Sequence, residues 1–357
     1  MYDCIVVGGG QAGLAAGYYL KRNKINFKIV DANESPGGSW LHTWDSLKLF
    51  SPSNTSSLPG MPMPESEGRF PTKYEVIRYF EKYEKRYGLP IDRPFKVENI
   101  HQNEMSSFSV HSDNNQVLDS KTLILATGTW SGYKIPEYDG LENYEGKNIH
   151  SAIFRSASDF VDGNTLVIGG GNSGAQIAAE LSKNGNCTWA TISEPVFMDK
   201  EIDGYKLFDL ASQKYRASVR DDSSEKQTFL GNIVQVPEVK VALESRVYNI
   251  RRMPKRFTRK GVEWPDGSKE DFDSVIWCTG FEADLSIARK LIKDNGGTEN
   301  QRINVDGQKS KDVKGLWLLG YGNWTGFASA TLIGVGRTAK KAVSEIQDYL
   351  KVLNQPE

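Results

Sequence analysis

The chain of 357 residues is long enough for two or three domains, and 38% hydrophobic with 25% charged residues is the composition of an ordinary globular protein. Its 44 Lys and Arg residues against 45 Asp and Glu residues give a net charge of −1, which excludes a chain-wide basic field for nucleic acid. Three scattered cysteines and four scattered histidines provide neither a disulfide framework nor a zinc spacing, so we expect no metal and a reducing, cytoplasmic location. No apolar run reaches the ~18–20 residues of a membrane helix, so we expect no membrane partner.

The N-terminal residues carry the strand–turn–helix–strand pattern of a dinucleotide-binding unit. The pattern consists of an apolar strand at 4–7, the turn GGGQAG at 8–13, a helix at 14–21 and a strand at 27–30. Gly8 allows a tight turn, Gly10 lets the backbone approach a pyrophosphate, and Gly13 lets the helix pack on the strand. Asp31 then follows the second strand, where a carboxylate accepts hydrogen bonds from ribose hydroxyls. We therefore predict a dinucleotide site, against the alternative of a glycine-rich turn that binds nothing.

The same pattern recurs 161 residues further on, from Gly8 to Gly169. It consists of a strand at 166–168, the turn GGGNSG at 169–174, a helix at 175–181 and a strand at 188–192. Ala-Thr-Gly at 126–128 and Cys-Thr-Gly at 278–280 also match, each after an apolar strand. Two such modules indicate two dinucleotides that exchange electrons; the alternative is that one module serves only as scaffold.

The predicted fold class is therefore α/β, with two Rossmann-like dinucleotide-binding domains and the second inserted into the first. We expect residues 1–154 and 276–357 to form the first domain and residues 155–275 the second. The pattern also predicts an amphipathic helix over 74–87 and a long C-terminal helix over 331–353. A basic stretch over 251–260 is interpreted as a solvated face, with a nucleic-acid patch as the weaker alternative.

At this point the sequence resembles the flavin-containing monooxygenases, and most closely their compact bacterial branch. The segment GGSW at 37–40 is similar to the family's flavin-contacting segment. Tyr144, Gly146, His150 and Phe154 have the spacing of the family fingerprint, with Tyr in place of its first Phe. The resemblance covers essentially the whole chain, and we expect His150 to be structural more than catalytic.

The resemblance implies FAD in the first module and a nicotinamide dinucleotide, NADH or NADPH, in the second. The FAD positions that it carries over are Gly8, Gly10, Gln11, Ala12, Gly13, Asp31, Gly38, Ser39, Trp40, Val97, Ala126, Thr127 and Gly128, with Thr331 near the flavin ring. The nicotinamide positions are Gly169, Gly171, Asn172, Ser173, Gly174, Glu194 and Gly280.

The implied reaction is hydride transfer from the nicotinamide to FAD, formation of a flavin hydroperoxide from oxygen, and oxygenation of a small nucleophile such as a sulfide, an amine or a ketone. A homodimer is expected from the resemblance. The chain has no paired cysteines for a dithiol relay, so electrons go to oxygen or a diffusible acceptor. Two alternatives stay open: an NAD(P)H oxidase or flavin reductase without oxygen insertion, and a non-enzymatic redox-sensing flavoprotein.

Two departures from the family pattern bear on the details. Glu194 stands where a site that prefers NADPH has an arginine, and Lys200 is the only nearby cation before Lys206, so we expect NADH to be preferred. Phe50 matches the position of the family's oxygen-side asparagine, and Asn54 lies four residues on in a different register. Phe50 and Asn54 are the candidate catalytic positions, and an apolar Phe50 predicts weak oxygenation with more peroxide leakage.

Overall fold

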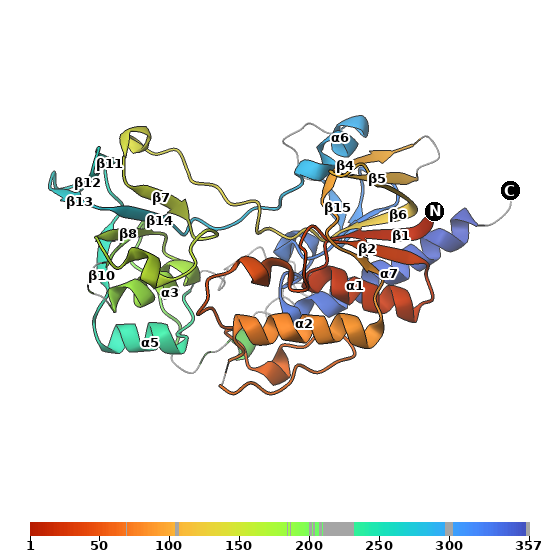
Figure 1. Cartoon of the computed structure of the whole chain (residues 1–357), viewed down its shortest axis with the longest axis horizontal. Coiled ribbons are helices and arrows are strands. Elements are labelled where there is room, and N and C mark those ends of the chain that lie inside the picture. Colours follow the sequence, from red (N-terminus) through yellow and green to blue (C-terminus); the bar gives the residue numbers. More distant parts are fainter. Residues whose placement is uncertain are drawn as a thin grey trace, which may run out of the picture. The chain divides into compact units, whose positions relative to one another are not determined.

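The computed structural model describes residues 1–68, 70–103, 107–183, 185, 187–199, 202, 204–206, 209, 232–296 and 303–354. The chain divides into two compact units (Figure 1). Unit 1 comprises Met1–Leu41, Pro52–Gly132 and Glu282–Glu357, and unit 2 comprises His42–Ser51 and Tyr133–Phe281.

Unit 1 is built on a largely parallel sheet of order β15-β16-β17-β6-β1-β2-β3. Its parallel strands are β1 (Tyr2–Val7), β2 (Phe27–Val30), β3 (Ile91–Asp92), β6 (Val117–Leu125) and β17 (Leu316–Leu318). The antiparallel strands are β4 (Val97–Gln102) and β5 (Phe108–Ser112), which extend from β6, and β15 (Val305–Asp306) and β16 (Lys309–Ser310). The buried run Cys4–Val7 in β1 explains the central place of this strand, because both faces of a parallel sheet are covered.

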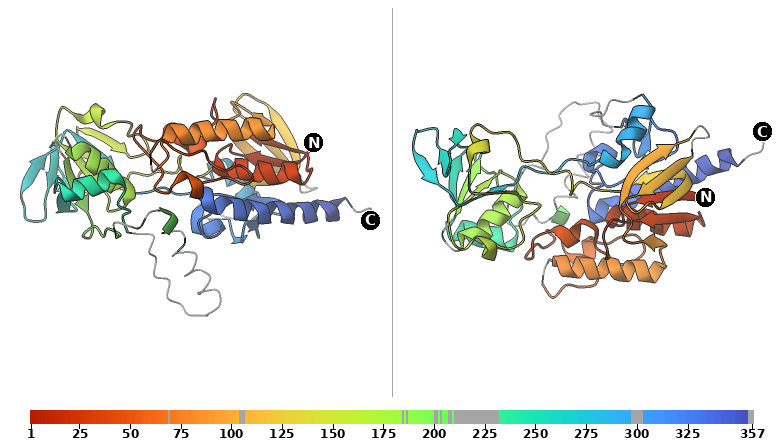
Figure 2. Two further views of the ribbon diagram at one scale, coloured as in Figure 1. Left: turned by 90° about the horizontal axis from the view of Figure 1, so that it is seen from below. Right: turned by 45° about the horizontal axis from the view of Figure 1, so that its top comes forward.

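Helices cover both faces of this sheet. The helices are α1 (Gln11–Arg22), α2 (Lys73–Tyr87), α6 (Arg289–Asp294) and α7 (Leu332–Leu353), with 3-10 turns at η2 (Ser53–Thr55), η6 (Ser286–Ala288) and η7 (Gly322–Thr325). α1 packs against α7, and α2 lies beside α1 (Figures 1 and 2). On the opposite face, Ile5 and Val7 of β1 join one buried cluster with the β4–β5 hairpin and α6.

The helix α2 shows how local sequence sets an element. Thr72 and Glu75 form a capping box, in which the Glu75 amide donates to Thr72 Oγ1 at 3.3 Å and the Thr72 amide donates to Glu75 Oε2 at 2.8 Å. Gly88 ends the helix with a left-handed φ of +50°. The apolar face of this predicted amphipathic helix is buried, so its aromatic side chains belong to the core; it consists of Val76, Tyr79, Phe80 and Tyr83.

Unit 2 contains a second parallel sheet, of order β10-β9-β8-β14-β7. Its strands are β7 (Lys147–His150), β8 (Thr165–Ile168), β9 (Cys187–Thr191), β10 (Asn249–Arg252) and β14 (Ser274–Trp277). Its helices are α3 (Asn172–Ser182) and α5 (Pro237–Glu244), with 3-10 turns at η3 (Leu141–Asn143) and η4 (Ala157–Phe160). The turn η1 (Gly38–His42) spans the junction in the chain between the two units.

Alternate residues of these strands serve the two faces of the second sheet. Val167 packs into a cluster with α3 and α5, while Leu166 and Ile168 face a three-stranded antiparallel sheet. That small sheet consists of β11 (Arg256–Phe257), β12 (Gly261–Glu263) and β13 (Lys269–Asp271). The second dinucleotide module is thus a complete layered unit.

The α/β fold class with parallel Rossmann-like sheets is confirmed. The unit boundaries differ from the expected domain boundaries, because residues 133–154, 276–281 and 42–51 lie in unit 2. The reason is β7, which precedes the second glycine turn but pairs with β14. Over the part of the chain that the structure describes, no helix is both long and apolar enough to cross a bilayer.

Candidate dinucleotide sites

The first glycine turn is a tight connection between β1 and α1. Gly8 has a φ of +110°, and a Cβ atom added to it would lie 2.3 Å from the carbonyl oxygen of Ala126. A Cβ atom on Gly13 would lie 1.8 Å from the carbonyl oxygen of Gly8. Both glycines are therefore required by the chain itself, as the sequence pattern predicts.

Gly10 differs from these two glycines. A Cβ atom on Gly10 would meet only the Cα of Gly38, at 3.7 Å, which is an ordinary contact, and its φ is −79°. Gly10 also caps α1 without any side-chain hydrogen bond to the first turn. The protein does not itself require a glycine here, so the bare backbone leaves room and free N–H groups for a bound phosphate.

Asp31 is buried at the end of β2 and is already partnered. Its Oδ2 accepts from Arg93 Nε at 2.9 Å, and its Oδ1 accepts from the backbone and side chain of Asn33 at 3.3 and 3.0 Å. Arg93 also donates to both carboxylate oxygens of Glu84, at 2.7 and 2.8 Å. The remaining acceptor capacity of Asp31 for a ribose hydroxyl is therefore mainly on Oδ2.

Arg93 was not among the predicted site residues. Its side chain is 10% exposed, and its Nη2 lies 2.6 Å from the point where a Cβ of Gly9 would stand. It thus connects α2, β2 and the glycine turn. Its only sequence signal is a position after a short strand, 62 residues beyond Asp31.

The segments around the first turn take up the other predicted flavin positions. Gln11 Nε2 donates to the carbonyl of Ala330 at 2.5 Å. Thr127 Oγ1 lies 2.7 Å from the hydroxyl of Tyr321. Thr331 caps α7: its Oγ1 accepts from the Gly334 amide at 3.1 Å. These contacts order the 126–128 and 330–334 segments around the turn.

The remaining predicted flavin positions lie in η1, in α1 and in β4. Ser39 and Trp40 lie in η1, with Ser39 exposed and Trp40 half-buried. Ala12 is buried on α1, and a Cβ on Gly320 would lie 2.9 Å from its Cβ. Val97 is buried in the core cluster with β5, so only its backbone is free to contact an adenine.

The second glycine turn repeats the first in unit 2. Gly169 has a φ of +132°, and its Cβ would lie 2.4 Å from the carbonyl oxygen of Cys278. The Cβ of a residue at Gly174 would lie 2.0 Å from the carbonyl oxygen of Gly169. Gly171 has no atom within 4 Å of its Cβ position and caps α3 without a side-chain bond. Both turns therefore follow the same rule. The first and last glycines of each turn are required by backbone contacts, and the middle one, Gly10 or Gly171, has room for a Cβ atom.

The polar neighbours of this second turn come from distant segments. Asn172 Oδ1 accepts from the Val234 amide at 2.9 Å, which leaves its NH2 group as a donor. Ser173 is half-buried in the first turn of α3, and Gly280 is exposed with a φ of +84°. Glu194 is exposed beyond the end of β9, consistent with a surface position at the expected ribose site. Of the loop that follows, Lys200, Glu201 and Asp203 lie outside the described residues.

Burial shifts the pKa of both the thiol and the imidazole near the second turn. Burial raises the pKa of the Cys278 thiol to about 12. Burial also lowers the pKa of His150, whose Nδ1 accepts from the Ala152 amide at 3.1 Å. The His150 ring stacks on Tyr133, with ring centroids 4.9 Å apart. These contacts support a structural role for the fingerprint histidine.

The two candidate catalytic positions fall in different units. Phe50 is in unit 2, where the residue is 41% exposed and its carbonyl accepts from the Gly204 amide at 2.6 Å. Asn54 is exposed in η2 of unit 1. No contact of either side chain assigns it to oxygen chemistry, so both roles stay predictions.

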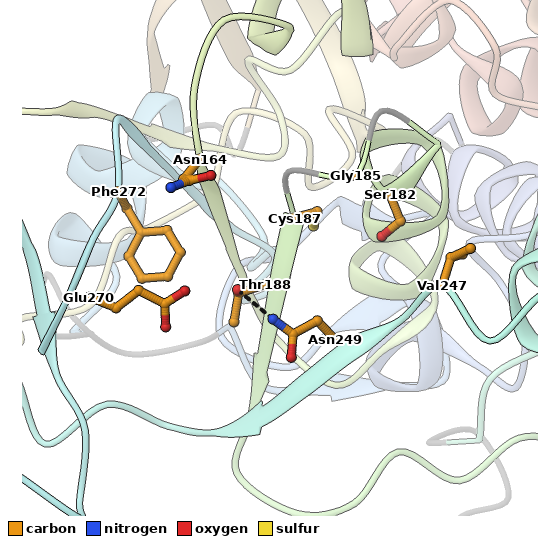
Figure 3. A pocket seen from close by; sticks show the side chains of 9 residues that line it. All are labelled: Asn164, Ser182, Gly185, Cys187, Thr188, Val247, Asn249, Glu270 and Phe272. Carbon is orange, nitrogen blue, oxygen red and sulfur yellow. Dashed lines mark hydrogen bonds between the residues drawn. The ribbon is translucent and has the colours of Figure 1, made fainter. Parts of the chain in front are cut away.

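A separate small cavity of about 160 Å³ lies at the opposite, amino-terminal ends of β8, β9 and β10 (Figure 3). Asn249 Nδ2 donates to Thr188 Oγ1 at 3.0 Å across one side of it. Glu270, also in the lining, is already paired with Arg251 at 2.9 Å. This cavity is therefore not part of the site at the glycine turn, which lies at the carboxyl ends of the strands.

The two turns fit dinucleotides on their own geometry. The uncapped helix starts at Gly10 and Gly171 offer N–H groups and the positive end of a helix dipole, and no described side chain lies within 4 Å of either Cβ position. Among the described residues no group of three His, Cys, Asp or Glu side chains is arranged to hold a metal ion. The geometry therefore supports two phosphate-binding turns in one chain.

Comparison with known proteins identifies the family. The family model described as pyridine nucleotide-disulphide oxidoreductase matches residues 5–320. The solved flavin-containing monooxygenase from Stenotrophomonas maltophilia is 40% identical, with a TM-score of 0.86 over 98% of this chain and 99% of that chain. The uncharacterized oxidoreductase CzcO of Bacillus subtilis is 31% identical over 97% of this chain and 99% of its own. The indole-3-pyruvate monooxygenase YUCCA1 of Oryza sativa is 24% identical over 96% of this chain and 90% of its own.

These similarities span both units and confirm the resemblance seen in the motifs. The chain is an enzyme of the oxidoreductase class, and its family implies a flavin, a pyridine nucleotide, a small-molecule substrate and oxygen. A disulfide relay has no support, since Cys4, Cys187 and Cys278 are all free. The chain belongs to the flavin-containing monooxygenases, within the pyridine nucleotide-disulphide oxidoreductase family.

Proposed function

We propose that this protein is an FAD-dependent monooxygenase that uses NADH in preference to NADPH and oxygenates small soft nucleophiles such as sulfides or amines, and also ketones. The observation that carries the proposal is the pair of equivalent turns, where Gly10 and Gly171 leave open space that no contact within the protein requires. FAD, when bound, supplies the two-electron acceptor and the group that activates oxygen. A homodimer and a cytoplasmic location remain part of this proposal.

The residues of the chain have binding and orienting roles in this proposal. Gly10 and the start of α1 hold the FAD pyrophosphate, and Asp31 accepts from the adenosine ribose. Gly171 and the start of α3 hold the pyrophosphate of the nicotinamide coenzyme. Glu194 accepts from a free ribose hydroxyl and repels a 2′-phosphate, which is the basis of the NADH preference.

Oxygen transfer to a thioether tests the proposal directly. Holoenzyme is incubated with NADH, 18O2 and methyl phenyl sulfide in the presence of catalase, and the sulfoxide is examined by mass spectrometry. One 18O atom in the sulfoxide is expected. NADH oxidation without labelled sulfoxide, together with stoichiometric peroxide in a parallel incubation without catalase, would overturn the monooxygenase proposal.

The second candidate function is an NAD(P)H oxidase or flavin reductase, and Phe50 is the feature that favours it. A phenylalanine ring offers no hydrogen bond on the oxygen side of a flavin. Phe50→Asn is therefore expected to raise the fraction of NADH that ends in sulfoxide, and Asn54→Ala serves as the matched variant in the alternative register. Equal peroxide leakage in wild type and Phe50→Asn, together with lower coupling in Asn54→Ala, would transfer the role to Asn54.

A further inference from the structure

Most of the basic side chains in the stretch 251–260 form ion pairs within unit 2. Arg251 bonds Glu270 at 2.9 Å, and Arg256 bonds Glu263 at 2.8 Å. Arg259 bonds Glu145 at 2.9 Å. These pairs explain most of the charge as internal salt bridges. Arg252 and Lys260 are in none of the ion pairs found among the described residues, and of these two only Arg252 lies in β10.

Strand pairing places Arg252 at the carboxyl end of the second parallel sheet. In β10, Arg252 stands opposite Thr191, the last residue of β9. Its Nη1 donates to the carbonyl of Ile192 at 2.5 Å, so the exposed guanidinium is held against the loop that leads to Glu194. In dinucleotide-binding sheets, the residues just beyond the second strand of the βαβ unit, which is β9 here, face the adenosine ribose.

The glycine turn is adjacent to the same strand end. A Cβ on Gly170 would lie 3.7 Å from the side chain of Thr191, and the position next to it, Gly171, faces open space. Arg252 therefore contacts, at the Ile192 carbonyl, the loop that carries Glu194 and that follows β9. One group is a fixed cation with planar N–H donors, and the other is an anion.

We infer that Arg252 binds the 2′-phosphate of a phosphorylated nicotinamide coenzyme and that the site admits NADPH through this residue. The inference rests on the proposed function, in which the second turn holds the nicotinamide coenzyme. An arginine fork matches phosphate oxygens and keeps its charge at every physiological pH. Glu194 opposes the same phosphate, so the balance between these two side chains sets the ratio of NADPH to NADH affinity.

Arg251 supplies a matched control for Arg252. The two arginines are neighbours on β10, and their side chains point to opposite faces of the strand. Arg251 is held in its pair with Glu270 and its guanidinium lies 4.5 Å from the Trp264 ring centroid. Loss of one positive charge from β10 is common to Arg251→Gln and Arg252→Gln, but only the second removes the proposed phosphate contact.

The test is calorimetric titration of the FAD-loaded protein with NAD+, NADP+, ADP and 2′,5′-ADP. Arg252→Gln is expected to lower the ratio of 2′,5′-ADP affinity to ADP affinity by about ten- to a hundredfold, with Arg252→Lys in between. Arg251→Gln is expected to leave this ratio within about twofold of wild type. Glu194→Gln is expected to shift the ratio in the opposite direction, toward the phosphorylated ligand.

Equal ratios in Arg252→Gln and Arg251→Gln would overturn the assignment of Arg252, while binding of ADP and NAD+ to both would leave the nicotinamide site itself intact. Failure of wild type to bind any of the four ligands would instead overturn the proposed function of the second turn. A steep salt dependence of 2′,5′-ADP binding in wild type that is reduced in Arg252→Gln supports the inference.

Discussion

The Cβ that Gly169 lacks would lie 2.4 Å from the carbonyl oxygen of Cys278, and the same relation at 2.3 Å joins Gly8 to Ala126. In each unit the glycine turn is therefore fixed against the residue that precedes a Thr-Gly pair. This shared contact ties the two recurring sequence motifs of each module into one local structure. The motifs are 118 residues apart in the first unit, from 8 to 126, and 109 residues apart in the second, from 169 to 278.

The two kinds of glycine predict different effects of alanine. Gly169→Ala forces a left-handed φ and a backbone clash, so we expect a loss of about 2 kcal/mol or more in the free energy of unfolding. Gly171→Ala meets no atom within 4 Å, so we expect a loss of only a few tenths of a kcal/mol and at least about a tenfold loss of NADH affinity. Urea unfolding and NADH titration measure both. Normal NADH binding by a folded Gly171→Ala would argue that the open space is not the pyrophosphate site.

Arg93 predicts a coupling between stability and FAD affinity. Arg93→Gln leaves Asp31 and Glu84, with side chains 6% and 12% exposed, without their shared cation, so we expect a loss on the order of 3 kcal/mol in stability. Because the orientation of Asp31 is lost too, FAD affinity falls by about tenfold or more, as measured by flavin fluorescence.

A neighbouring ion pair provides the control for Arg93. Lys28 bonds Asp92 at 2.9 Å, and the Asp92 side chain is 42% exposed, so Lys28→Gln is expected to cost less than about 1 kcal/mol. It is expected to leave FAD affinity within about twofold of wild type. Similar FAD affinities for Arg93→Gln and Lys28→Gln would mean that Arg93 has no part in the flavin site.

The cysteines predict resistance to alkylation in the folded state. Burial raises the pKa of Cys4, Cys187 and Cys278 to about 12, so almost no thiolate is present at pH 8. Iodoacetamide is expected to label the native protein far more slowly than the urea-unfolded protein, as followed by mass spectrometry. Fast labelling of Cys278 alone in the native state would indicate a reactive thiol at that position and contradict this prediction.

The same thiols contribute a pH dependence of stability. Their folded pKa values lie above the unfolded value of 9.0, so the folded state binds more protons once the pH exceeds that value. Their contribution is complete below about pH 9 and is lost as the pH rises toward 12. Urea midpoints measured between pH 8 and pH 10.5 are expected to fall, with a smaller fall in Cys278→Ala.

Substitutions at Thr331 distinguish a helix-capping role of its hydroxyl from a flavin-binding role. Its Oγ1 accepts from the Gly334 amide and donates to the carbonyl of Ala328 at 2.8 Å, so the hydroxyl is used within the chain. Thr331→Val is expected to cost about 1 kcal/mol of stability, and Thr331→Ser much less. If FAD affinity of Thr331→Val fell a hundredfold while its stability matched wild type, a direct contact with the cofactor would replace the capping account.

What could be predicted from the sequence was local. The strand–turn–helix units around Gly8 and Gly169 were predictable because their glycines follow a short sequence pattern. Within each turn one glycine packs against another, and the first glycine packs against the residue before a Thr-Gly pair that itself recurs in the sequence. Arg93 and Arg252 were not predictable, because the pairing of strands far apart in sequence brings Arg93 to the first glycine turn and Arg252 to the end of β9. The placement of 147–150 in the second unit has the same origin, since its partner β14 begins at residue 274.

The most direct measurement of the central claim is stopped-flow absorbance of the FAD-loaded protein, reduced anaerobically with NADH and mixed with oxygenated buffer with and without methyl phenyl sulfide. For a monooxygenase we expect a transient absorbance that precedes the oxidised flavin spectrum and decays faster as the thioether concentration rises. Direct return to oxidised flavin at a rate independent of the thioether, with one peroxide formed per flavin, would contradict it and identify an oxidase or reductase.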